Sequence, residues 1–227
     1  DIANSTVICG KAVYQEPFSV ALFLGHNKPE DIRAWRKLVQ RKFNLSNVSP
    51  TSAGVISRYD RNCVKSLKVA AWKRTEGSAL RHMTNMAQVK NLVADYTDIP
   101  LIVLNSHSKM LPKDQISVFR SFDILISTHG AQLTNMVFGR ENAAYIEVVA
   151  VPNDWFIRNG RSFAKAYIHS VGHLPANNPN LTKKMESCLS TAEECDRVTK
   201  WQFRQTDLIV NISILKRDLE DALAVLC

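Results

Sequence analysis

Short apolar runs, each about as long as one buried strand, alternate along the chain with segments of helical periodicity. A run of this kind, without alternating polar residues, is typical of a parallel strand covered on both faces. The expected strands are residues 20–24, 53–57, 99–104, 124–126, 144–149 and 166–169. Because strands that alternate with helices build βαβ units, the sequence predicts an α/β fold with a Rossmann-like parallel sheet.

Apolar residues at helical spacing predict the helices between these strands. Proline at the first turn favours a helix start at Pro29 and at Pro112. The expected helices are residues 29–43, 85–95, 112–122, 132–138 and 214–226. Residues 59–80 show no clean period and are expected to form an irregular excursion. A polar loop is expected after Pro175.

The positive charge is concentrated in one stretch of the sequence. Residues 58–90 hold eight Lys and Arg against two acidic residues, which is +6 of the net +8 of this 227-residue chain. The rings Tyr59 and Trp72 are too few for the aromatic interleaving of single-strand nucleic-acid binders. The stretch therefore favours a phosphate or polyanion site, and we expect no nucleic-acid partner.

Cysteines and glycosylation sequons bear on the compartment. There is no Cys-x-x-Cys, and a zinc set of His169, His173, Cys188 and Cys195 has no standard spacing, so no metal site is expected. A disulfide between Cys188 and Cys195 is expected in an oxidising compartment. Five Asn-x-Ser/Thr sequons favour secretory exposure. No apolar run reaches the roughly 18 residues of a membrane helix, so a membrane anchor would lie outside this segment.

Residues 123–138 have the layout of a ligand site in a parallel sheet. A strand ends at Ser127, a turn follows at His129 and Gly130, and a helix then begins. Helix-terminal N–H groups bind phosphate, and glycine allows close approach. His129 either donates to a phosphate or ribose, or is a capped turn residue. Glu147, inside a buried strand, needs a partner, which is either a ribose or a buried arginine.

Arginines at two strand–helix connections complete the candidate site. Arg58 ends a predicted strand, and Arg81 lies just before a predicted helix. A guanidinium grips a diphosphate with two parallel hydrogen bonds. The alternative is that both are surface arginines.

Five motifs in a fixed order resemble glycosyltransferase family 61. They are Ser57-Arg58, Arg81-His-Met-Thr-Asn85, residues 115–123 (Gln-Ile-Ser-Val-Phe-Arg-Ser-Phe-Asp), residues 129–135 (His-Gly-Ala-Gln-Leu-Thr-Asn) and Ala144-Tyr-Ile-Glu147. The family includes plant xylan xylosyl- and arabinosyltransferases, an EGF-domain O-GlcNAc transferase and the O-mannose β-1,4-N-acetylglucosaminyltransferase. The resemblance covers roughly residues 50–150, with a weaker similarity at residues 204–210.

The resemblance implies the C-terminal half of a GT-B glycosyltransferase in the Golgi or ER lumen. Such an enzyme transfers a sugar from a UDP-sugar to a glycan or glycoprotein hydroxyl, with inversion and without a metal or other cofactor. The implied donor-binding residues are Arg58 and Arg81 on the diphosphate, His129, Gly130, Ala131, Gln132, Leu133, Thr134 and Asn135 on diphosphate and nucleoside, and Glu147 on the ribose. Arg58 and His129 would stabilise the leaving group, whereas the resemblance identifies no catalytic base. Relatives place the second arginine closer to the first, so Arg61 and Arg74 are alternatives to Arg81.

The resemblance also divides the chain. Residues 1–50 would be the end of an N-terminal domain or a first βα unit. Residues 51–175 would form the Rossmann-like domain that binds the nucleotide-sugar, and residues 176–227 a polar loop, a disulfide loop and a closing helix that crosses back to the first domain. We therefore expect part of a longer protein. The alternatives are a catalytically silent nucleotide-sugar or glycan-binding relative and a polyanion-binding module.

Overall fold

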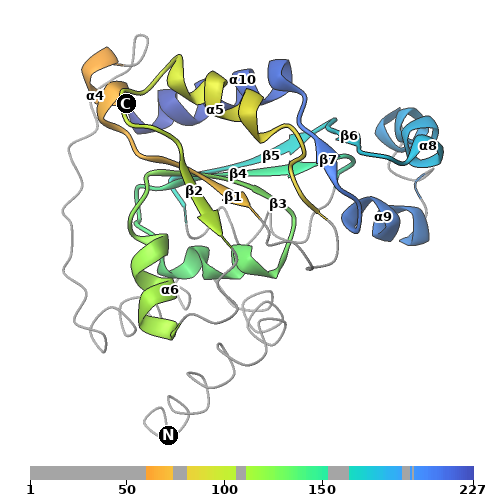
Figure 1. The fold of residues 1–227 in the computed structure, drawn as a ribbon, viewed down its shortest axis with the longest axis horizontal. Coiled ribbons are helices and arrows are strands. Elements are labelled where there is room, and N and C mark those ends of the chain that lie inside the picture. The colour runs from red at the N-terminus through yellow and green to blue at the C-terminus, as the bar shows by residue number, and fades with distance from the viewer. Residues whose placement is uncertain (1–59, 74–80, 106–110, 153–163, 191–194, 196) are drawn as a thin grey trace, which may run out of the picture.

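The computed structural model describes residues 60–73, 81–105, 111–152, 164–190, 195 and 197–227 (Figure 1). The elements expected at residues 20–24, 29–43 and 53–57 lie outside these residues. The first expected domain, residues 1–50, also lies outside them, as do the predicted site residue Arg58 and Arg74, one of the two alternatives to Arg81.

Five parallel strands form the central sheet, in the order β2-β1-β3-β4-β5. Their bounds are Val69–Lys73 (β1), Ile102–Asn105 (β2), Ile124–Thr128 (β3), Ala144–Val149 (β4) and Ala166–Val171 (β5). This is one of the two common doubly wound orders, in which ligands bind beside the point where the strand order reverses. Here the reversal lies between β1 and β3. The predicted α/β fold with a parallel sheet is confirmed.

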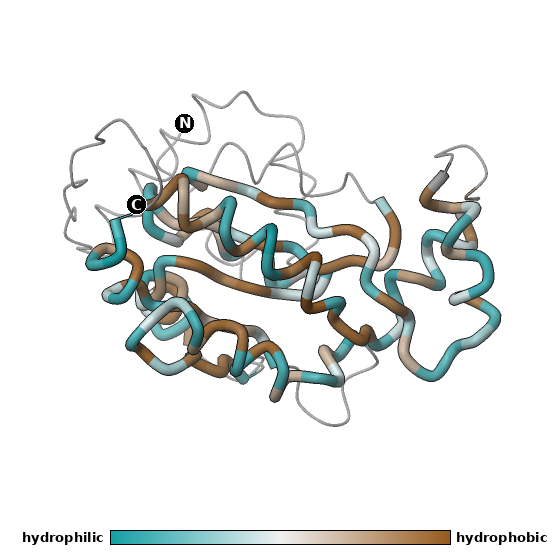
Figure 2. Tube along the Cα trace, turned by 90° about the horizontal axis from the view of Figure 1, so that it is seen from above, coloured by the Kyte–Doolittle hydropathy of each residue, from teal (hydrophilic) through white to brown (hydrophobic). Residues whose placement is uncertain are grey.

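Helices cover both faces of the sheet, as Figure 1 shows. Helices α4 (Arg61–Ser66), α5 (Met86–Ala94) and α10 (Ile212–Leu226) pack on one face. Helix α6 (Pro112–Phe119) and the 3-10 helix η1 (Ala131–Phe138) pack on the other. Along these helices hydrophobic stretches alternate with hydrophilic ones (Figure 2). Each helix therefore buries one side against the sheet, which supplies most of its stability.

Several predicted elements are confirmed with nearly the predicted bounds. Strand β4 coincides with residues 144–149, and α5 differs by one residue at each end from residues 85–95. Strand β2 begins later than predicted, at Ile102, and its residues are only partly buried because it lies at the edge of the sheet. Pro100, which has no N–H for the ladder, precedes it.

The irregular excursion expected at residues 59–80 is a wrong prediction. Its described part contains α4 and β1, an interior strand of the sheet. Four consecutive residues of β1, from Val69 to Trp72, are buried, and Lys73 follows them exposed at the end of the strand. The run is short and half of it is alanine, so its strand character is weak beside the surrounding charge.

A smaller lobe follows the sheet. It contains β6 (Leu174–Pro175), α8 (Pro179–Ser190), α9 (Arg197–Arg204) and β7 (Leu208–Ile209), with β6 and β7 paired antiparallel. The predicted polar loop after Pro175 is therefore only a few residues long, because Asn178 caps α8 by accepting from the N–H of Leu181 at 3.1 Å. The predicted Cys188–Cys195 disulfide joins the end of α8 to the segment before α9.

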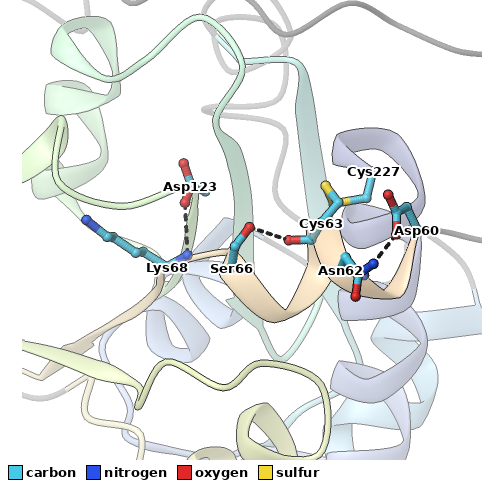
Figure 3. Close-up of a disulfide and its surroundings, with 7 residues drawn as sticks. All are labelled: Asp60, Asn62, Cys63, Ser66, Lys68, Asp123 and Cys227. Carbon is cyan, nitrogen blue, oxygen red and sulfur yellow. Dashed lines mark hydrogen bonds between the residues drawn. A yellow bond between two sulfur atoms is a disulfide. The ribbon is translucent and has the colours of Figure 1, made fainter.

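A second disulfide connects distant parts of the chain. Cys63 on α4 is bonded to Cys227 after α10, across 164 positions of sequence (Figure 3). Helix α10 itself lies on the sheet of this domain, where Leu215, Leu219 and Leu223 are fully buried. The apolar face of α10 thus packs on this sheet. The expectation that the last helix crosses back to the first domain stays a prediction, because residues 1–50 lie outside the described residues.

Candidate active site

A row of polar residues crosses the sheet near the carboxyl ends of three neighbouring strands. Ser127 on β3 is in register with Glu147 on β4, which is in register with His169 on β5. Residues in register project to the same face, and here it is the face that α6 and η1 cover. The side chains of Ser127 and Glu147 are 0% exposed, so both need partners inside the protein.

Glu147 has three such partners. Its Oε1 lies 2.6 Å from Nδ1 of His129, and its Oε2 lies 2.7 Å from the hydroxyl of Tyr167 and 3.0 Å from Nδ1 of His169. Burial alone raises the pKa of this carboxyl, but the hydrogen bonds from the two histidines outweigh burial and lower the pKa to about 2. Glu147 is therefore an anion. Its protein partners are two histidines and a tyrosine rather than the arginine that was one of the two predicted alternatives. The predicted contact with a ribose stays a prediction.

His129 lies between this buried carboxylate and two cationic side chains. Burial lowers the pKa of the imidazole, Glu147 raises it, and the positive charges of Arg204 and Arg81 lower it further, so that the net pKa is below its usual range. Its side chain is 12% exposed. The ring is thus partly accessible and sits where a change in nearby charge shifts its protonation.

Arg81 has a backbone conformation that bulky residues rarely adopt. Its φ is +83°, in the left-handed region. Its carbonyl oxygen accepts a hydrogen bond from Oγ1 of Thr128 at 2.8 Å, and its Nη1 donates to the carbonyl of His129 at 3.5 Å. These contacts tie the connection after β1 to the end of β3. Strained backbone held in this way is common at functional sites.

Hydrogen bonds also join residues 82–85 to residues 207–210, a pairing that we call the 82–85/207–210 seam. The amide of His82 donates to Oδ1 of Asp207 at 2.7 Å. The side chain of Asn85 both donates to the carbonyl of Val210 at 2.9 Å and accepts from its amide at 2.8 Å. The seam fixes the segment after Arg81 against the segment after α9, although they are 125 positions apart.

An open pocket lies at the carboxyl ends of β3 and β4. Three basic side chains line it, namely Arg81 before α5 and Lys200 and Arg204 on α9. His129 borders it as well, and the end of β4 and the residues after it, 148–152, form an apolar wall. The pocket thus lies beside the reversal of strand order, where ligands of doubly wound sheets bind, and its polar lining suits an anion.

The comparison with known families decides the class of this protein. A family model described as Glycosyltransferase 61 matches residues 19–146, more than half of the chain. The chain belongs to glycosyltransferase family 61. It is therefore a glycosyltransferase, an enzyme that moves a sugar from a donor to an acceptor. A comparison with curated proteins finds no match.

The family match covers Arg81 and His129 and ends one residue before Glu147. Lys200 and Arg204 lie beyond it, as do Tyr167 and His169. The glycosyltransferase pocket therefore combines residues of the matched region with residues that the match does not include.

Most of the predicted 129–135 loop is engaged within the glycosyltransferase itself. Leu133 and Thr134 are buried in η1. Gln132 donates to the carbonyl of Thr128 at 3.1 Å, and Asn135 donates to Oε1 of Gln115 at 3.3 Å. Gly130 is buried, and Ala131 begins η1. Among the described side chains of this loop, only His129 lines the pocket. The predicted contacts of the other residues with a nucleotide stay predictions.

Most of the described basic residues in the stretch 58–90 of this family 61 member do not line the pocket. Helix α4 precedes β1 and carries Arg61, so this alternative to Arg81 lies at the amino ends of the strands, away from the pocket. Of the described basic residues in 58–90, only Arg81 lines the pocket, whereas five are exposed. These five are Arg61, Lys65, Lys68, Lys73 and Lys90. Of the described basic residues in this stretch, the structure therefore places Arg81 alone at the pocket, and the predicted polyanion site stays a prediction.

Lys200, Arg204, Tyr167 and His169 are site residues that the sequence analysis missed. The only signal for Arg204 was the weak similarity at residues 204–210. Tyr167 and His169 alternate on a short strand, but only the register with β4 places them against Glu147. No local pattern in the sequence encodes that register.

Two kinds of feature are absent from the described residues. No cluster of three or more His, Cys, Asp or Glu side chains there is arranged to hold a metal ion. In the same residues, no helix combines the length and the apolar character needed to cross a bilayer.

Proposed function

We propose that this glycosyltransferase binds a UDP-sugar with the diphosphate in the cationic pocket. It transfers the sugar, with inversion and without a metal ion, to a hydroxyl group of a glycan or glycoprotein. The observation that carries the proposal is the convergence of Arg81, Lys200, Arg204 and His129 on one pocket at the carboxyl ends of β3 and β4. A diphosphate is the part of a nucleotide-sugar that such a set of charges recognises.

The transfer is a single displacement. The acceptor oxygen bonds to the anomeric carbon while the bond from that carbon to the β-phosphate oxygen of UDP breaks. The hydroxyl proton passes to a base, and UDP leaves with one additional negative charge. Fixed cations that face this developing charge stabilise the transition state more than the ground state. Arg81, Lys200 and Arg204 fill that role in the proposal.

The fold and the disulfides support the wider assignment. The five-stranded sheet with its closing helix α10 resembles one Rossmann-like half of a GT-B enzyme. We propose that it is the C-terminal, donor-binding half and that the acceptor binds largely on other parts of the protein. Two disulfides favour an oxidising compartment, in agreement with the lumen of the ER or Golgi.

Calorimetric titration with UDP tests the binding site. Replacing Arg81 or Arg204 by alanine removes charge-assisted hydrogen bonds and should weaken binding about 10- to 100-fold. The matched control is Arg61→Ala, an exposed arginine of α4 that lies outside the pocket, for which we expect less than about a twofold change. Equal losses in all three variants would contradict the pocket assignment.

Product analysis tests the reaction. UDP release is measured with UDP-xylose, UDP-arabinose and UDP-N-acetylglucosamine, with and without EDTA, and the anomeric configuration of the product is read by NMR. Release that EDTA abolishes would refute the metal-independent mechanism, and a retained configuration would refute the single displacement. Tight UDP binding without release from any donor would identify a catalytically silent relative.

A further inference from the structure

Two of the five Asn-x-Ser/Thr sequons lie within the described residues. They are Asn180-Leu-Thr182 in the first turn of α8 and Asn211-Ile-Ser213 at the start of α10. The other three begin before residue 50 and lie outside the described residues. An N-linked oligosaccharide is bulky and hydrophilic, so a folded protein can carry one only where the asparagine reaches solvent. The structure thus decides between sequons that the sequence leaves equivalent.

The sequon in α8 has its two essential residues on the surface. Asn180 and Thr182 are exposed, whereas Leu181 between them is buried and anchors the helix. The cap of α8 is made by Asn178, whose side chain accepts from the amide of Leu181 at 3.1 Å. The side chain of Asn180 is therefore not needed to begin the helix, and a glycan on it would not disturb the cap.

Asn211 is exposed as well, although its side chain caps α10. Its Oδ1 accepts from the amide of Ser213 at 3.1 Å and from the amide of Ile214 at 3.3 Å. N-glycosylation replaces a hydrogen on Nδ2 and leaves the lone pairs of Oδ1 in place. The cap and a glycan would therefore use different atoms of the same carboxamide. Ser213, which completes the sequon, is also exposed.

Both sequons are separate from the lining of the proposed donor pocket. No described side chain of α8 or α10 lines that pocket, and α8 lies beyond the end of the central sheet (Figure 1). The chain passes from β6 to α8 and from β7 to α10, and β6 pairs antiparallel with β7. The two sequons therefore follow opposite ends of this short ribbon. Glycans at these positions can coexist with a donor in the pocket.

We propose that Asn180 and Asn211 are N-glycosylation sites that are modified in the ER lumen. The co-substrate is an oligosaccharide linked to a lipid diphosphate, and a separate transferase of the cell catalyses the step. Nδ2 of the asparagine bonds to the anomeric carbon of the first sugar while the bond from that carbon to the diphosphate oxygen breaks. Nδ2 loses one proton, and the lipid diphosphate leaves with the electron pair. The inference goes beyond the proposed transfer reaction and rests only on the proposed luminal compartment.

Peptide mapping of the whole protein tests both sites. The protein is expressed from its complete coding sequence in cells of the organism that makes it. A peptide N-glycosidase in heavy-oxygen water then converts each glycosylated asparagine to labelled aspartate. Trypsin releases Asn180 in the peptide 166–183 and Asn211 in the peptide 205–216, and we expect the label at both positions. Asn177 and Asn178 share the first peptide but have no Ser or Thr two residues later, so they should stay unlabelled.

Matched variants separate the modification from the fold. Thr182→Ala and Ser213→Ala each destroy one sequon at an exposed residue, and each should remove one glycan, seen as one step in electrophoretic mobility. Thr182→Ser and Ser213→Thr keep the sequons and should keep the glycans. Enzymatic removal of the glycans from the folded protein should leave the affinity for UDP unchanged, because no described side chain of α8 or α10 lines the pocket.

The outcomes separate this inference from the proposed function. An unlabelled Asn180 or Asn211, in a protein whose two disulfides have formed, would overturn the inference at that site and leave the proposed function in place. Label at Asn180 that persists in Thr182→Ala would overturn it too, because the label would then not depend on the sequon. A protein that is glycosylated at both sites but does not bind UDP would refute the donor pocket and leave the inference in place.

Discussion

Replacing Cys63 and Cys227 by serine removes a covalent link between α4, at the start of the described domain, and the residue that follows α10. Cross-links stabilise a folded protein mainly because they restrict the unfolded chain, and the effect grows with the length of the loop they close. The protein contains a built-in comparison, because the Cys188–Cys195 bond closes a loop with a sequence separation of 7, against 164 for Cys63–Cys227.

The chain-entropy treatment gives a magnitude for each bond. Loss of the bond that closes the long loop lowers the free energy of unfolding by about 5 kcal/mol. Loss of the bond that closes the short loop lowers it by about 2.5 kcal/mol. A domain of ordinary stability has about 5–15 kcal/mol in total. The Cys63→Ser/Cys227→Ser variant should therefore be close to unfolding, whereas the Cys188→Ser/Cys195→Ser variant should remain folded with a lower midpoint.

Equilibrium unfolding in guanidinium chloride, followed by far-UV circular dichroism, measures both losses. Wild-type protein unfolded in the presence of a reductant serves as a control. Its free energy of unfolding should be no higher than that of the Cys63→Ser/Cys227→Ser variant. If Cys188→Ser/Cys195→Ser costs as much as Cys63→Ser/Cys227→Ser, loop closure is not the source of the stabilisation and the reasoning is refuted.

Three further predictions concern single contacts. His173 is fully buried, and its pKa is lowered to about 4, mainly by burial. A lowered pKa means that the stability is present above the unfolded value of about 6.5 and is lost as pH falls toward 4. His173→Gln should therefore flatten a plot of unfolding free energy against pH between these values, and an unchanged slope would contradict the prediction. Gly139→Ala places a methyl group against the hydroxyl of Tyr145 and should lower the free energy of unfolding, measured in urea, by about 1–3 kcal/mol. Adding Tyr145→Phe should restore part of this stability, and a double variant as unstable as Gly139→Ala alone would show that the clash is not with this hydroxyl. Asn85→Ala removes both hydrogen bonds to Val210 and should lower the free energy of unfolding by about 1–3 kcal/mol. Thermal unfolding monitored by calorimetry measures this loss, and a Tm within error of wild type would show that the two hydrogen bonds add no stability.

The sequence predicted those elements whose own residues specify them. Strand β4 has six consecutive buried residues, and α10 places Leu215, Leu219 and Leu223 on one stripe. Such patterns follow from local periodicity alone. Helix α8 has a stripe of this kind too, since Leu181 and Met185 are buried four residues apart. Its remaining residues are so polar that the stripe does not stand out in the sequence.

The candidate site was only partly predictable because it depends on register and packing. His129 was found because a strand, a turn and a helix follow one another in sequence. The partners of Glu147 could not be found in this way, since Tyr167 and His169 meet it only through the pairing of β4 with β5. Arg204 joins the pocket only because α9 folds back beside the end of β4, which no neighbouring residues reveal.

The 82–85/207–210 seam has a consequence for the order in which this enzyme becomes able to bind its donor during synthesis. Arg81 and Arg204 lie just before its two halves, and the halves are 125 positions apart. At roughly 5–20 residues per second, a ribosome needs on the order of 6 to 25 seconds to make the intervening chain. The sheet strands β1 to β5 are complete well before residue 210 emerges. A nascent chain therefore passes through a stage in which the sheet is present but half of the cationic pocket is not.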